Sequence, residues 1–303
     1  MAPHYCGAFF IKGRVIMNQI TKKGYGKINL TLDVVGLMPN GYHELDMVMQ
    51  TVDLYDEVTV KKTDSGISVS SNTGKIPNDE SNLAYKAAKV LMDEFGVGEG
   101  VDISIQKRIP IAAGMAGGSA DCAATLKAVN ELFDLGLSDQ ELCDRGVKLG
   151  ADVPYCIMEG TRRAQGIGEV LTKLPAVPQA HIVLAKPDIS VSTAFVYGEI
   201  DKITPCNKPD TEAMIEALEN GDIKKVASNI CNVLEEVTIP KHGIVSVIKD
   251  VLTEKGALGA MMSGSGPTVF GIFDDRKKAE DAANALEAME GMEQVHLTGF
   301  YNK

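Results

Sequence analysis

One carboxylate, one lysine and one run of small residues carry the kinds of group that a group-transfer reaction needs. Asp152 is the only charged residue between 150 and 155, and Lys27 begins an alternating segment. Residues 110–120 read Pro-Ile-Ala-Ala-Gly-Met-Ala-Gly-Gly-Ser-Ala. Small residues that lead into a helix leave its first N–H groups open to an anion, which the helix dipole also attracts. Together these groups indicate phosphoryl transfer, which depends on positioning and charge neutralisation.

Each feature has a simpler interpretation when it is taken alone. The run at 110–120 could be a flexible connector, because it has neither the lysine of a Walker A loop nor the glycine spacing of a dinucleotide-binding loop. Asp152 could cap a turn, and Lys27 could be a solvated charge at a strand end. A second small-residue run at 263–268 could form only a tight turn. Their combination in one chain favours the catalytic interpretation.

Hydrophobic periodicity predicts the elements that would position these groups. Residues 27–34 alternate as a strand, with Lys27 and Asn29 on the same face. The glycine run follows a strand at 101–105 and leads into a helix. The apolar face of that helix comprises Ala123, Leu126, Val129, Leu132 and Phe133.

The other elements favour an α+β fold, because strands and helices follow one another without a steady β-α-β repeat. We expect further strands at 48–53, 57–61, 181–185, 268–273 and 294–298. We expect further helices at 81–95, 138–150, 211–219, 222–236, 243–255 and 275–289. Ser138 and Glu141 have the spacing of a capping box at the start of one of them.

Composition limits the kinds of molecule that this protein is expected to bind. The net charge of −11 argues against a general nucleic-acid-binding protein. An anionic ligand would need locally concentrated cations, each of which could instead be a solvated surface charge; the candidates are Lys27, Lys107, Arg108, Arg162 and Arg163. The cysteines show no zinc spacing, and Cys122, Cys143 and Cys156 lie in apolar patterns. We therefore expect a reducing, cytoplasmic location, and no apolar run approaches the length of a membrane span.

The 303 residues are enough for two domains. Residues 1–16 are interpreted as a leader outside the fold, because Met17 precedes the first well-patterned segment. A Pro/Gln stretch at 174–179 marks a boundary between an N-terminal domain, 17–174, and a C-terminal domain, 175–303. The last strand could return to the N-terminal domain.

Three segments resemble the motifs of the GHMP kinases, which are small-molecule kinases. They are 27–30, the run at 110–120, and 263–270. The resemblance implies a two-domain α+β fold with the active site in the cleft between the domains. The N-terminal, ATP-binding domain would be similar to domain 2 of ribosomal protein S5, and the C-terminal domain would be ferredoxin-like.

A branch of this superfamily is indicated by residues 41–43, 149–154, 160–161 and 166–169. They resemble the kinases that phosphorylate a hydroxyl of a cytidine diphosphate sugar alcohol in non-mevalonate isoprenoid biosynthesis. The resemblance implies ATP and Mg²⁺, and no nucleic acid, membrane or obligate protein partner. The chain departs from the usual pattern by Gly24-Tyr25-Gly26 before the lysine, by Met115, and by Arg162-Arg163.

The resemblance also implies a role for each matching residue. Asp152 would be the general base, with Lys27 as its catalytic partner. The ATP-binding residues would be Pro110, Gly114, Met115, Ala116, Gly117, Gly118, Ser119 and Ala120. The acceptor would contact Asn29, Tyr42, His43, Thr193, Tyr197, Gly264, Ser265 and Gly266. Within these sets, Tyr42 and His43 would hold the cytosine, and Ser119 is a candidate contact for the Mg²⁺ that ATP carries.

Two other functions stay open at this point. Another GHMP kinase, similar to mevalonate or homoserine kinase, would keep the phosphate loop but would not need Tyr42 and His43. A non-catalytic nucleotide sensor would need neither Asp152 nor Lys27, so the presence of both weighs against it.

Overall fold

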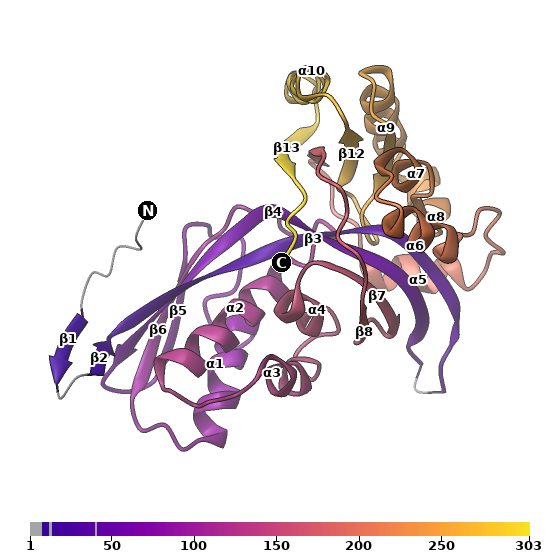
Figure 1. Ribbon diagram of the computed structural model, residues 1–303. Helices are drawn as coiled ribbons and strands as arrows, with labels where there is room; N and C mark the ends of the chain where they lie inside the picture. Colours follow the sequence, from indigo (N-terminus) through magenta and orange to yellow (C-terminus); the bar gives the residue numbers. More distant parts are fainter. Residues whose placement is uncertain (1–7, 12–13, 40) are drawn as a thin grey trace. The chain divides into compact units, whose positions relative to one another are not determined.

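The structure is a computed structural model that describes residues 8–11, 14–39 and 41–303 (Figure 1). Two compact units are present, and each is discontinuous in sequence. Unit 1 comprises residues 1–24, 55–108 and 118–158, and unit 2 comprises residues 25–54, 109–117 and 159–303. Strands β3 (Gln19–Leu37) and β4 (His43–Thr63) each contribute to both units, because the division falls within them.

In unit 1 the sheet is built around β6 (Gly100–Gln106), whose Val101, Ile103 and Ile105 alternate into the core. The second part of β4 pairs antiparallel with one edge of β6, and β5 (Ile67–Ser71) pairs parallel with the other. The helices are α1 (Leu83–Glu94), α2 (Gly117–Leu132), α3 (Asp139–Gly146) and α4 (Val153–Met158). Helix α1 packs on β5 and β6, and α3 packs on α4.

Unit 2 contains a four-stranded antiparallel sheet with the order β11-β12-β9-β13. Its strands are β9 (His181–Pro187), β11 (Gly259–Met262), β12 (Val269–Phe273) and β13 (Met292–Gly299). Helices α9 (Ile244–Glu254) and α10 (Arg276–Glu287) pack on this sheet. The buried residues of α10 are Ala279, Ala282, Ala283 and Leu286, a spacing that places them on one helical face.

The rest of unit 2 extends from the first part of β4. That part pairs with β7 (Thr161–Gly166), which pairs in turn with β8 (Val170–Lys173). The short strand β10 (Cys231–Asn232) pairs parallel with β3 at Thr31 and Leu32. Helices α5 (Thr193–Ile200), α6 (Thr211–Glu219), α7 (Ile223–Ser228) and α8 (Glu235–Lys241) complete the unit.

The C-terminal residues of unit 2 return to β4. Phe300 forms an isolated antiparallel bridge with Val52, and the Tyr301 N–H donates to the Thr51 carbonyl at 2.9 Å. The Gln50 side chain donates to the Tyr301 carbonyl at 3.0 Å. The Tyr301 ring stacks on Tyr25, with the ring centroids 4.1 Å apart.

The structure corrects two of the expected elements. The strands expected at 48–53 and 57–61 are one strand, β4, because Asp56 between them is paired inside unit 1 and does not start a turn. The helix expected over 222–236 is interrupted, since residues 229–234 leave the helix and include β10. Strands β5, β7, β8 and β11 and helices α4 and α5 had no counterpart among the expected elements. The capping box of Ser138 and Glu141 is confirmed, but helix α3 ends at Gly146 rather than at Gly150.

The expected leader, residues 1–16, lies partly outside the described residues, because 1–7 and 12–13 are not described. Within it, β1 (Ala8–Ile11) and β2 (Arg14–Met17) pair antiparallel as two short strands.

Candidate active site

Lys27 lies on β3 and is only 5% exposed, so the solvated strand-end interpretation is wrong. Its ammonium group donates to Asn29 Oδ1 at 2.8 Å, and Asn29 is fully buried beside it. The two residues share one face of the strand, as the alternation predicts. The backbone N–H of Lys27 donates to the Met115 carbonyl at 3.2 Å. Strand β3 is therefore hydrogen-bonded directly to the middle of the glycine loop.

The glycine loop packs closely against the second small-residue run of unit 2. Ser263 Oγ donates to the Gly114 carbonyl at 3.0 Å. A Cβ atom added at Gly114 would lie 2.1 Å from the Ser263 carbonyl oxygen, and one added at Gly264 would lie 3.4 Å from Lys27 Nζ. Gly114 and Gly264 thus allow two backbone segments and a lysine to converge, where larger residues would keep them apart.

The loop backbone is strained before the helix begins. Ala112 and Ala116 have positive φ values of 51° and 58°, and Gly114 has a φ of 72°. Gly117 and Gly118 are not among the residues with positive φ, although they stand where α2 starts. A left-handed backbone at alanine is uncommon and persists only where the surroundings hold it. Of the other predicted phosphate-binding residues, Pro110, Met115 and Ala120 are buried.

Two side chains form hydrogen bonds with the loop at 263–266 or with the residue just before it. Asn232, at the end of β10, donates to the carbonyls of Met262 and Gly264 at 2.9 and 2.8 Å. Thr193, at the start of α5, shares a hydrogen bond of 2.8 Å with Ser265 Oγ. The structure therefore brings the predicted residues Thr193, Gly264 and Ser265 together, and Asn232 joins them as a supporting residue.

A second group of predicted acceptor residues forms around His43. The His43 ring lies 5.0 Å from the Tyr197 ring, and its Nε2 atom lies 2.8 Å from Asp201 Oδ1. Tyr42, in contrast, is 59% exposed. His43 and Tyr197 are thus neighbours. Because Nε2 of His43 contacts Asp201, Nδ1 is the ring nitrogen that faces away from Asp201.

The remaining candidates belong to unit 1. Asp152 immediately precedes α4, and its carbonyl accepts the Cys156 N–H at 3.0 Å as the first bond of that helix. Among the described residues of unit 1, the Asp152 carboxylate has no hydrogen-bonded partner, so it does not act as a side-chain cap. A Cβ atom at Gly150 would lie 3.7 Å from Ser119 Oγ. Ser119, in the first turn of α2, therefore lies beside the segment that carries Asp152.

Gly24, one of the departures from the GHMP pattern, also contacts the first turn of α2. A Cβ atom there would lie 2.5 Å from the Ala120 carbonyl oxygen. Glycine at this position allows β3 to approach the helix closely.

Three of the other candidate cations form ion pairs within the protein, and the fourth, Arg162, donates from Nε to the Glu159 carbonyl at 2.8 Å. Lys107 is buried between Asp56 and Asp121, Arg108 pairs with Glu57, and Arg163 pairs with Asp46 and Glu212. Burial raises the pKa of Asp121 to about 8, with the charge of Asp56 adding to the effect and that of Lys107 opposing it. Lys107 is therefore neither a solvated charge nor an open anion ligand.

Comparison with known proteins identifies the family to which the sequence is similar. The N-terminal domain of the GHMP kinases matches residues 82–160, and their C-terminal domain matches residues 214–290. The 4-diphosphocytidyl-2-C-methyl-D-erythritol kinase of Lachnoclostridium phytofermentans is 47% identical over 94% of this chain and 98% of its own length. The chain belongs to this kinase family. The kinase of the same name from Acetivibrio thermocellus is 48% identical over 90% of this chain and 97% of its own length.

A solved structure gives the same fold for the kinase. The crystal structure of a 4-(cytidine 5'-diphospho)-2C-methyl-D-erythritol kinase is 30% identical, with a TM-score of 0.80, and the match covers 94% of this chain and all of that one. The predicted two-domain GHMP kinase fold is therefore confirmed. Among residues 8–11, 14–39 and 41–303, no helix combines the length and the apolar composition that a membrane crossing requires.

Sequence reasoning missed two polar residues that support the predicted site of the kinase. Asn232 lies within residues 222–236, for which the sequence predicts a helix. In the structure it belongs to β10, which pairs with β3, and its side chain donates to the carbonyls of residues 262 and 264. Asp201 follows α5, a helix that the periodicity did not indicate. A short-range signal did exist for α5, because Ser192 caps it by accepting the Phe195 N–H.

Proposed function

We propose that the chain transfers the γ-phosphoryl group of ATP to the 2-hydroxyl group of 4-diphosphocytidyl-2-C-methyl-D-erythritol. The observation that carries this proposal is the identity of 47% with a kinase of that name over nearly the whole length of both chains. The geometry agrees with it, because a buried lysine and two tightly packed glycine loops are what phosphoryl transfer uses.

Asp152 is the proposed general base. The acceptor hydroxyl is tertiary and weakly nucleophilic, so it gains from a carboxylate that takes its proton as the bond to phosphorus forms. The Asp152 carboxylate is available to accept this proton, since no described side chain or N–H group of unit 1 donates a hydrogen bond to it. Its place ahead of α4 fixes the backbone from which it projects.

Lys27 and the glycine loop supply the positive field for the phosphates. Lys27 Nζ is held by Asn29 at 2.8 Å, which fixes the direction of the ammonium group. The first N–H groups of α2 have no intrahelical partners and are suited to phosphate oxygens. Preorganised donors of this kind stabilise charge in the transition state without reorganising.

Mg²⁺ would arrive with ATP and neutralise phosphate charge. Ser119 offers a hydroxyl oxygen in the first turn of α2, a ligand type that suits Mg²⁺. The described residues hold no cluster of three or more His, Cys, Asp or Glu side chains arranged as a metal site. This is compatible with a metal that the nucleotide phosphates bind and that the protein contacts at few points.

The cytosine is proposed to lie against Tyr42 and His43. Replacing Tyr42 by Ala is expected to raise KM for the cytidine substrate about tenfold, because a stacked base contributes roughly 1–3 kcal/mol. His43→Ala should act in the same direction, and Asp201→Asn more weakly, since Asp201 acts through the orientation of His43. Steady-state kinetics with each substrate varied in turn would measure these effects.

KM for ATP should change by less than about twofold in these variants, because the residues would touch only the acceptor. Phe95→Ala provides a matched control, as Phe95 is an exposed aromatic residue at the end of α1. If KM for ATP rises instead, Tyr42 and His43 belong to the nucleotide half of the site.

A direct assay tests the whole proposal. ADP release with ATP and the cytidine substrate should be rapid, whereas mevalonate and homoserine should give no release above background. ³¹P spectra of the product should show a new phosphomonoester on the methylerythritol part. Turnover of mevalonate or homoserine in place of the cytidine substrate would overturn the proposal.

A further inference from the structure

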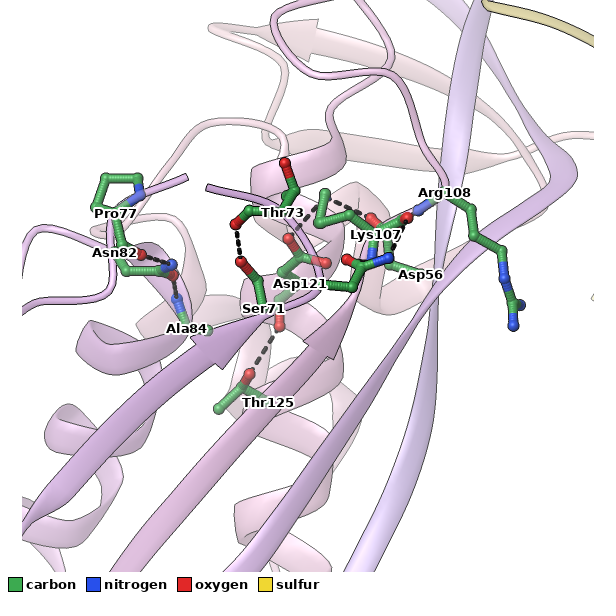
Figure 2. Close-up of polar contacts among 11 residues, drawn as sticks. Asp56, Ser71, Thr73, Pro77, Asn82, Ala84, Lys107, Arg108, Asp121 and Thr125 are labelled. Carbon is green, nitrogen blue, oxygen red and sulfur yellow. Dashed lines mark hydrogen bonds and ion pairs between the residues drawn. The ribbon is translucent and has the colours of Figure 1, made fainter. Parts of the chain in front are cut away.

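A buried ionic cluster in unit 1 joins the two ends of the glycine loop (Figure 2). Lys107 follows β6 at the start of the loop, and Asp121 lies in the first turns of α2 at its end. Lys107 Nζ donates to Asp121 Oδ2 at 2.8 Å and to Asp56 Oδ2, on β4, at 2.5 Å. The side chains of Lys107, Asp121 and Asp56 are 6%, 5% and 0% exposed, respectively. We call Asp56, Lys107 and Asp121 the loop clamp.

The backbone beside the clamp is fixed as well. Asp56 Oδ1 accepts the Arg108 N–H at 2.6 Å, so one carboxylate holds both residues that lead into the loop. Asn72 accepts the Lys107 N–H at 2.8 Å and donates to the Lys107 carbonyl at 3.3 Å. On the other side, the Thr125 hydroxyl donates to the Asp121 carbonyl at 2.8 Å. Both ends of the loop therefore meet at one buried lysine.

Burying three ionisable groups is costly, and replacing such groups by apolar ones is often neutral or stabilising. Asp121 Oδ1 is buried without a hydrogen-bond partner among the described residues, which adds to that cost. Stability alone therefore does not explain the cluster. The segment that it encloses contains Ala112 and Ala116 in left-handed conformations, a backbone that needs its surroundings to hold it.

We propose that the loop clamp is a positioning device, which fixes the ends of residues 109–120 and so holds the strained loop in its binding conformation. Joining the ends of a loop removes much of the conformational entropy that the loop would otherwise lose on binding. The consequence for nucleotide affinity rests on the proposed function, whereas the consequence for loop order does not. Asp56, Lys107 and Asp121 act on ATP through the backbone and are not catalytic residues.

The test separates positioning from simple charge balance. Lys107→Met leaves two buried carboxylates face to face and is expected to destabilise the protein strongly. The double variant Lys107→Met/Asp121→Asn removes one positive and one negative group and should recover much of that loss. If the clamp only balances charge, the double variant should bind ADP as the unmodified chain does. Asp121→Asn alone, which keeps the side-chain shape, is the fallback if both of these variants unfold.

Two readouts are needed on the folded variants. Hydrogen exchange of residues 109–120 without nucleotide should become at least about tenfold faster in the double variant. Calorimetry should show about tenfold weaker Mg-ADP binding, because a loop that is no longer preorganised must be ordered when the nucleotide binds. KM for the acceptor should stay within about twofold. Lys62→Met is the matched control, because Lys62 lies on the same strand as Asp56 in an exposed pair with Glu99.

The outcomes distinguish the two proposals. Unchanged loop exchange and unchanged ADP affinity in the double variant overturn the clamp while leaving the kinase function intact. Faster loop exchange in the double variant, together with an unmodified chain that binds neither ADP nor ATP, supports the clamp and overturns the proposed function.

Discussion

Asp152→Asn is expected to lower kcat by about 10²-fold or more, because a positioned general base contributes about 10²–10⁴-fold. The amide keeps the size of the side chain but cannot take the proton of the acceptor hydroxyl. Asp152 makes no side-chain hydrogen bond within unit 1 among the described residues, so its replacement should cost little stability. Rapid-quench measurement of a single turnover would report the chemical step directly.

Asp144→Asn is the matched control for this variant. Asp144 is an exposed carboxylate on α3, in the same unit, and its replacement should leave kcat unchanged. Calorimetric titration of ATP should give similar affinities for Asp152→Asn, Asp144→Asn and the unmodified chain. Near-normal single-turnover rates in Asp152→Asn would remove Asp152 from the mechanism.

Gly114→Ala is expected to disrupt the site through the backbone. The new Cβ would lie 2.1 Å from the Ser263 carbonyl oxygen, so one of the two loops must move. The φ of 72° adds a conformational cost of about 1–2 kcal/mol. We expect KM for ATP to rise about tenfold or more, since the loop can no longer pack against 263–266. Initial-rate kinetics and urea unfolding would separate the loss of function from the loss of stability.

Gly136→Ala isolates the conformational part of that effect. Gly136 has a φ of 73°, almost the same as Gly114, but no atom lies within 4 Å of the position of its Cβ. This variant should lose a similar conformational free energy and keep a normal KM for ATP. Equal kinetic effects of the two substitutions would mean that the contact with Ser263 is unimportant.

Local sequence patterns predicted the elements whose signals are short-range. The alternation at 27–34 places Lys27 and Asn29 on one face of a strand, and the small residues at 110–120 lead into a helix, which begins within the run at Gly117. The capping box at Ser138 correctly predicted the start of α3. In each case the residues that carry the signal lie within a few positions of the structure they determine.

The errors arose where distant contacts override local preference. Asp56 disfavours a strand on its own, yet β4 continues through it because Lys107, 51 residues away, pairs with it. Asn232 lies in a helix-like segment, but pairing with β3 makes it a strand residue. The sequence alone indicates a solvated or ligand-binding cation at Lys107, because nothing adjacent in sequence reveals the two carboxylates that bury it.

The contacts of residues 300–302 with β4 determine which of the two units can be completed first during synthesis. Val52 leaves the ribosome early, but its bridge to Phe300 cannot form until Phe300 has been made as well. The hydrogen bonds of Thr51 and Gln50 to Tyr301 likewise cannot form until Tyr301 has been made, and Tyr301 is 251 residues from Gln50 in sequence. Contacts of such separation are costly to close and form slowly. Unit 2 can therefore be completed only once residues 300–302 have emerged, whereas every segment of unit 1 is available once residue 158 has emerged.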